Sequence, residues 1–192
     1  MVRALIDRIR QTKDTHLLLS VVPQFQARSY KKGETLLHQG AVWDKAFFIE
    51  RGLIRLHTIG LDGKDFSTGF WAEGGMVFPI TADMEQQAAG FNISALEDST
   101  VWQASMSDLR PGLENRGLWE PLRAELLGTL LGRKSQRELD LQTLDGRARY
   151  QKFCQQEPSL AARVPLVHLA SYLGITDVSL SRIRRQLKDA QD

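Results

Sequence analysis

The feature that most constrains the fold of this 192-residue chain is the segment 165–188, where a glycine separates two short helical patterns. Pro165 suits the first turn of a helix, where its missing N–H needs no partner. Gly174 ends the first pattern, and glycine reaches the left-handed conformation without a Cβ clash. Thr176 is a good N-cap for the second helix. Apolar residues recur at helical spacing around this turn: Leu166, Leu169, Ala170, Leu173, Ile175, Leu180, Ile183 and Leu187.

These offsets predict a helix-turn-helix. Two helices that cross near a right angle leave little room, which explains the small residues Ala170 and Gly174 near the crossing. An unrelated helical hairpin, the alternative explanation, would match only two or three of these positions. In a helix-turn-helix, the outward face of the second helix enters the major groove of DNA.

The outward face of the second helix supplies the candidate DNA-binding residues. We expect Arg182 to make a bidentate contact with guanine, the commonest specific pairing. Arg184, Arg185 and Lys188 are expected to contact phosphates, with plain solvent exposure as the alternative for Arg184 and Lys188. Ser179 and Ser181 could reach bases or phosphates. The candidate set is Thr176, Val178, Ser179, Ser181, Arg182, Arg184, Arg185 and Lys188.

Between about residues 30 and 105 the pattern changes to short runs rich in β-branched and aromatic residues, separated by turn signals. The clearest turn is Asp62-Gly63, a hairpin signal because glycine tolerates a positive φ. Evenly spaced strands of this kind predict an antiparallel β barrel or jelly roll. Before it, residues 3–22 predict one or two short helices that end at Pro23.

A long helical pattern runs from Leu118 to about Leu144, and a further helix is predicted from about Arg147 to Gln156. The leucine stripe of the long helix could pack on the chain's own barrel or pair with a second copy, and the sequence leaves both open. The candidate dimer-interface residues are Leu122, Leu126, Leu127 and Leu130. The expected class is α+β, with a sensor barrel over 1–115, a dimerisation helix over 116–144 and a helix-turn-helix domain over 145–192.

Composition argues against several other classes. No apolar run approaches the roughly 18–20 residues of a membrane span, and the charged N-terminus does not read as a secretory signal, so we expect a cytoplasmic protein. The single cysteine, Cys154, excludes an intramolecular disulfide, and an inert core thiol is its expected role. The four histidines form no His-x-His pair, and no activated nucleophile is evident. We therefore expect no metal, no cofactor and no enzymatic activity.

Three stretches together resemble transcription factors of the Crp/Fnr type, the family of the catabolite activator protein. KKGETLLHQGAVWDKAFFIERGLIRLHTIGLDGK resembles the opening strands of its cyclic-nucleotide-binding barrel, and FNISALEDSTVWQAS resembles the closing strands. ASYLGITDVSLSRIRRQL resembles the DNA-binding end. The resemblance implies a homodimer that binds double-stranded DNA at a palindromic operator and is controlled by an effector in the barrel.

The chain departs from that family in its effector cassette, in its recognition helix and in the short link 157–164, which leaves little room for a β-wing. Ala89-Gly90 stand where cyclic-AMP sensors carry Arg-Ser or Arg-Thr, and Pro79 stands near the place of a Glu. Without that arginine the cyclic phosphate loses a charge-assisted partner, so we expect no meaningful binding of cyclic AMP. The effector, if there is one, is an unknown small molecule.

Asp177-Val178 replace a Pro-Glu pair that many relatives carry, so the operator preference should differ. The alternative function is a ligand-sensing or protein-interaction module with weakened DNA binding.

Overall fold

The computed structural model describes residues 24–115 and 117–189. The helices predicted within 3–22 lie outside these residues. In this part of the chain, eight strands form two antiparallel sheets, one in the order β1-β8-β3-β6 and the other in the order β2-β7-β4-β5. The strands are β1 (Gln26–Tyr30), β2 (Thr35–Leu37), β3 (Lys45–Arg51), β4 (Ile54–Ile59), β5 (Asp65–Trp71), β6 (Met76–Val77), β7 (Asn92–Ala95) and β8 (Ser99–Ser105).

The core between the sheets is built by side chains that alternate along the strands. Phe47 and Ile49 of β3 and Val101 of β8 meet Ile54 of β4 and Ile93 of β7, all nearly or completely buried. The predicted hairpin at Asp62-Gly63 is confirmed. It joins β4 to β5, and Gly63 takes a φ of 77° that favours glycine.

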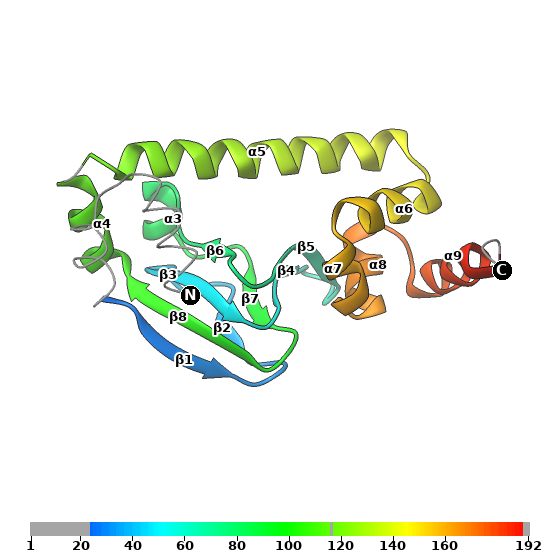
Figure 1. The fold of residues 1–192 in the computed structure, drawn as a ribbon, viewed down its shortest axis with the longest axis horizontal. Helices are drawn as coiled ribbons and strands as arrows, with labels where there is room; N and C mark the ends of the chain where they lie inside the picture. Colours follow the sequence, from blue (N-terminus) through cyan, green and yellow to red (C-terminus); the bar gives the residue numbers. More distant parts are fainter. Residues whose placement is uncertain (1–23, 116, 190–192) are drawn as a thin grey trace.

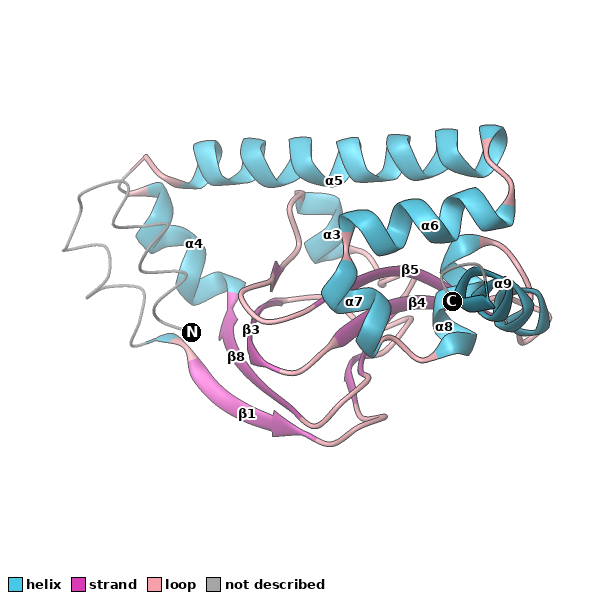
Figure 2. Ribbon diagram, turned by 45° about the vertical axis from the view of Figure 1, so that its right-hand side comes forward, coloured by secondary structure: helices cyan, strands magenta, loops and turns pink. Residues whose placement is uncertain are grey.

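Helix α5 lies along one side of the sheets, α4 lies at one end, and the helices from α6 to α9 lie at the other end (Figure 1). The long helix α5 spans 25 residues, about 37 Å at the usual helical rise, and follows α4. Figure 2 shows α6 below the C-terminal half of α5, with α8 at the ends of β4 and β5. The helices are α3 (Ala82–Gln86), α4 (Met106–Glu114), α5 (Trp119–Thr143), α6 (Gly146–Gln156), α7 (Pro158–Arg163), α8 (Leu166–Leu173) and α9 (Asp177–Asp189).

Two further apolar clusters attach the helices to the sheets. One places α4 and the first turns of α5 against Phe48 of β3 and Ala104 of β8. The other joins Leu169 and Leu180 of the C-terminal helices to Phe70 of β5. This second cluster connects segments that the sequence assigns to different domains. Within the described residues, no helix is both long and apolar enough to cross a membrane.

Candidate functional site

The turn between α8 and α9 has the geometry that its sequence predicts. Gly174 takes a φ of 67°, and Ile175 donates its backbone N–H to the carbonyl of Ala170 at 3.1 Å, which closes the end of α8. A Cβ at position 174 would lie 2.9 Å from Cδ2 of Leu141 on α5. The positive φ is therefore what favours glycine here, since the Leu141 methyl could move aside.

Side-chain hydroxyls cap the start of α9. Thr176 Oγ1 accepts the backbone N–H of Ser179 at 3.1 Å, as predicted for an N-cap, and donates to Ser179 Oγ at 2.8 Å. Asp177 accepts the N–H of Val178 at 2.8 Å and places a carboxylate in the first turn. The hydroxyls of Thr176 and Ser179 are thus bound to each other, so Ser181 is the free serine of the predicted set.

The two faces of α9 differ as the sequence predicts. Leu180 is completely buried, and Ile183 and Leu187 are half-buried. The opposite face is exposed, and Val178 alone exposes 74% of its surface. Among the described residues, no acidic side chain pairs with any of the four α9 cations, Arg182, Arg184, Arg185 and Lys188.

The three positions predicted as the degenerate effector cassette carry no charged side chain. Pro79 is fully buried, and Ala89 is buried with its backbone paired to Gly40 and Ala41. The carbonyl of Gly90 accepts the hydroxyl of Thr58 at 3.1 Å. None of these positions offers a guanidinium or a carboxylate to a nucleotide phosphate or ribose.

The two sheets resemble a known ligand-binding domain. Residues 27–116 match the model of the cyclic nucleotide-binding domain. The matching model is that of a binding domain, and no curated protein sequence matches the chain.

Three solved structures share the fold of the cyclic nucleotide-binding domain together with its C-terminal helices. FixK2 from Bradyrhizobium japonicum is 17% identical with a TM-score of 0.80, over 87% of this chain and 86% of that one. The c-di-GMP-responsive global regulator CLP from Xanthomonas campestris is 14% identical with a TM-score of 0.73, over 93% of both chains. A regulator assigned to the Crp/Fnr family from Eubacterium rectale is 14% identical with a TM-score of 0.72, over 92% and 84%. The resemblance to Crp/Fnr-type regulators is confirmed at the level of the fold.

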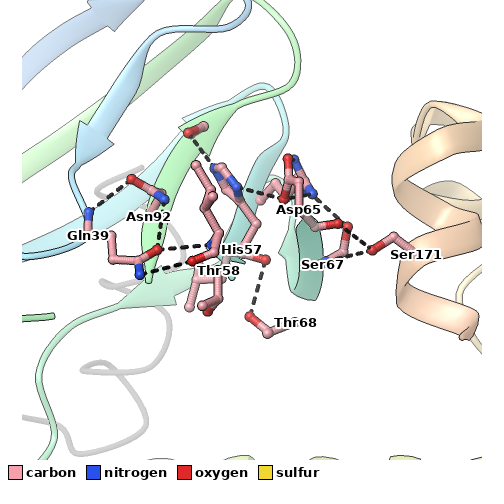
Figure 3. A network of polar contacts seen from close by, with 12 residues as sticks. Gln39, His57, Thr58, Asp65, Ser67, Thr68, Asn92 and Ser171 are labelled. Carbon is pink, nitrogen blue, oxygen red and sulfur yellow. Dashed lines mark hydrogen bonds and ion pairs between the residues drawn. The ribbon is translucent and has the colours of Figure 1, made fainter. Parts of the chain in front are cut away.

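Helix α8 is attached to the edge strand β5 by hydrogen bonds (Figure 3). Ser171 Oγ accepts the backbone N–H of Ser67 at 2.9 Å and donates to the carbonyl of Asp65 at 3.1 Å. These residues are 104 and 106 positions apart, and no local pattern in the sequence signals the contact. The face of α8 that carries Ser171 therefore rests against the edge strand of the domain.

Behind this contact lies a charged network on β4 and β5. Arg55, which is 4% exposed, donates two hydrogen bonds to the carboxylate of Asp65, at 2.9 and 2.6 Å, and a third to Ser67 Oγ. Burial would raise the pKa of Asp65, but the hydrogen bonds and charge of Arg55 outweigh it and lower that pKa. Burial, aided by the charge of Arg55, lowers the pKa of His57. His57 is therefore neutral at neutral pH.

His57 also bridges Asp65 and Ser94, with Nδ1 3.0 Å from Asp65 Oδ1 and Nε2 3.0 Å from Ser94 Oγ. Sequence reasoning missed this juxtaposition because the three residues come from three different strands. Hydrolases use the same three residue types, with a carboxylate that stabilises the imidazolium. Here Arg55 neutralises that carboxylate, and Thr35 lies 3.3 Å from Ser94 Oγ. We assign the network a structural role.

A second ionic contact fixes the end of α7. Arg163 donates to Glu73 and to Glu97 at 2.7 Å each, and Glu73 also accepts the backbone N–H of Gly52 at 2.8 Å. The hydrogen bonds from Arg163 lower the pKa of Glu73 to about 2. Residues 157–164, which were predicted to leave little room for a β-wing, form helix α7 instead.

The leucine stripe of α5 is split between two faces. Leu122, Leu126 and Leu130 pack against the apolar cluster formed by α4 and the strands. Leu127 and Leu131 lie on another face and are exposed, Leu131 by 63%. Of the four candidate dimer-interface residues, Leu127 alone thus points away from the barrel.

Proposed function

We propose that the chain is a sequence-specific DNA-binding transcriptional regulator of Crp/Fnr type, in which α8 and α9 form the helix-turn-helix. The observation that carries this proposal is the exposed face of α9, where Arg182 and its basic neighbours have no acidic partner among the described residues. Phosphates and base edges are the groups that unpaired arginines on such a face can bind.

The input side of this regulator is the barrel, in which we propose that the two sheets form a jelly roll that binds no cyclic AMP. The uncharged cassette at Pro79, Ala89 and Gly90 supports this proposal. The proposed division remains a sensor over 1–115, a dimerisation helix over 116–144 and a DNA-binding domain over 145–192.

Arg182→Ala should weaken binding to the preferred duplex by about 1–3 kcal/mol and relax the specificity at one base position, because a bidentate guanine contact is lost. Lys188→Ala should weaken binding to all duplexes alike, since a phosphate contact carries no sequence information. Fluorescence anisotropy on the preferred duplex and on single-base variants measures both effects. Lys64→Ala, at the hairpin tip where Lys64 pairs with Asp62, is the matched control.

If Arg182→Ala changes neither affinity nor specificity, the assigned orientation of α9 is wrong. If the unmodified protein binds no duplex at low salt, the result favours the alternative function, a ligand-sensing or protein-interaction module with weakened DNA binding. The exposed Val178 and the carboxylate of Asp177 at the start of α9 favour that candidate.

We further propose a homodimer formed through the outer face of α5. Leu127 and Leu131 are exposed one helical turn apart, and Cβ atoms at Gly128 or Gly132 beside them would meet nothing within 4 Å. Two helices can therefore approach closely along this face. Leu126 and Leu130 pack inward, so arginines there would disturb folding before association.

The double variant Leu127→Arg, Leu131→Arg should sediment as a monomer. In the proposed dimer, the arginines of one α5 would be buried against the same arginines of the second α5. Leu61→Arg, on the fully exposed tip of the β4–β5 hairpin, should leave the dimer intact. A double variant that still sediments as a dimer and keeps its thermal stability would move the interface away from α5.

A further inference from the structure

Two arginines connect the C-terminal end of α8 to α5 and α6. Arg137 of α5 donates from Nε and Nη2 to the backbone carbonyl of Tyr172, at 3.3 and 2.9 Å. Arg149 of α6 donates to the carbonyl of Leu173 at 2.8 Å and to that of Leu144, at the end of α5, at 2.5 Å. The last carbonyls of a helix have no partner within it and attract cations. Each arginine therefore makes hydrogen bonds that α8 cannot make for itself.

The side chain of Tyr172 adds further contacts at the same point. The guanidinium of Arg137 lies over its ring, with Cζ 4.9 Å from the ring centroid. The ring also packs against Phe70 of β5 and Phe153 of α6, at centroid distances of 5.4 and 5.6 Å. The sheet, α6 and a cation of α5 thus meet at one residue of α8.

Close packing alone does not fix α8 against α5. A cavity of about 220 Å³ lies beside the C-terminal half of α5, and Arg137, Arg149 and Tyr172 are among the residues that line it. Leu169 and Leu173 hold α8 in the apolar cluster with the sheet, but hydrophobic burial has no preferred direction. A guanidinium presents its donors in a rigid planar fork. These hydrogen bonds are therefore the directional contacts that can set the angle between α8 and α5.

The orientation of α9 depends on that of α8. The connection between the two helices is only residues 174–176, and Leu180 of α9 is fully buried in the same cluster as Leu169 and Leu173 of α8. In Figure 1, α9 lies at the end of the molecule toward which the C-terminal end of α5 points. We therefore expect α8 and α9 to move as one unit relative to α5.

We propose that Arg137 and Arg149 are positioning residues that set the half-site spacing of the operator. The inference rests on the proposed DNA-binding function and on the proposed dimer through α5. In such a dimer, the separation of the two α9 helices depends on how each α9 is oriented on its own α5. That separation has to match the duplex, because one added base pair moves a half-site by about 3.4 Å and turns it by about 34°.

Anisotropy titrations test the proposal on three duplexes, with the preferred half-site spacing and with one base pair less or more. We expect the unmodified protein to favour its own spacing by at least about tenfold, and Arg137→Met to reduce this preference to within about twofold. Arg149→Met should act in the same direction. Arg133→Met, one helical turn earlier on α5, is the matched control. Arg133 lies 3.9 Å from Glu157, too far for a hydrogen bond, so this variant should keep the preference.

A second measurement uses no DNA. Nitroxide labels at Glu120→Cys on α5 and Ser181→Cys on α9, in a Cys154→Ala background, report the distance between the two helices by pulsed electron paramagnetic resonance. Dilution with unlabelled chain restricts the signal to distances within one chain. We expect a narrow distance distribution without further change and a broader one in Arg137→Met, because the directional contacts of α8 to α5 are lost.

The proposal is overturned if the distance distribution of Arg137→Met stays narrow, or if Arg137→Met binds DNA with an unchanged spacing preference. An equal loss of affinity on all three duplexes is such an unchanged preference, and it would show that Arg137 only stabilises the fold. If the unmodified protein binds no duplex, the proposed function fails. The distance distribution then decides by itself whether the arginines position α9.

Discussion

Asp65→Ala is expected to lower the free energy of unfolding by about 1–3 kcal/mol, because the buried guanidinium of Arg55 loses its acceptor while Asp65 itself is 42% exposed. The cost arises at Arg55, which is almost completely buried and would keep its charge without the two hydrogen bonds from its guanidinium to the carboxylate. Urea denaturation measures the change. Asp62→Ala, three residues away on the same hairpin, removes only an exposed pair and should cost less than about 1 kcal/mol.

A double variant separates the ion pair from mere loss of packing. Arg55→Met in the Asp65→Ala background removes the stranded charge and should recover a large part of the lost stability. If the single variant costs less than about 1 kcal/mol, or the double variant is the less stable of the two, the network does not hold the hairpin as described.

The same network makes stability depend on pH in a defined direction. The pKa values of Asp65 and His57 are both lower in the folded chain than their ordinary values, so the unfolded chain binds protons more readily. The stability that Asp65 and His57 contribute is fully present at pH values above the pKa values that these residues have in the unfolded chain. It is lost as the pH falls through the folded pKa of His57 and then that of Asp65. In acid, the free energy of unfolding of Asp65→Ala should accordingly change less with pH than that of the unmodified protein.

Leu180→Ala is expected to cost about 2–5 kcal/mol and to uncouple the C-terminal helices from the barrel. Leu180 is fully buried in the cluster that contains Leu169 and Leu173 of α8 and Phe70 of β5. Truncation removes methyl groups from a site with no solvent access, so the cavity left behind adds to the lost burial. DNA affinity should fall together with the stability of α8 and α9, although Leu180 lies opposite the proposed DNA-binding face of α9.

Hydrogen exchange of the α8 and α9 amides, with urea denaturation, measures this effect. Leu139→Ala on α5 removes the same atoms from a half-exposed position and should cost less than about 1 kcal/mol. Full protection of α8 and α9 in Leu180→Ala would show that the cluster does not hold these helices.

Local patterns predicted much of this structure, because their physical causes are local. The positive φ of Gly174, the cap at Thr176 and the inward face of α9 follow from neighbours within a few positions. The β4–β5 hairpin is predicted by Asp62-Gly63 for the same reason.

Contacts between distant segments were not predictable from one sequence. The pairing of Arg163 with Glu73 joins residues 90 positions apart. That the buried indole N–H of Trp43 has no hydrogen-bond partner among the described residues is known only from the folded structure. The leucine stripe of α5 shows the intermediate case. The helix was predicted, but its leucines cover two faces, and the sequence does not show which of the two faces packs against the sheets.

The most direct test of the central claim is selection of duplexes from a random library by the purified full chain, followed by titration with salt. The account predicts an inverted repeat whose half-sites lie about one helical turn apart. It also predicts an affinity that falls at least about a thousandfold between about 50 and 200 mM salt, for six or more phosphate contacts per dimer. Recovery of no common sequence, together with no measurable binding at the lower salt concentration, would contradict it.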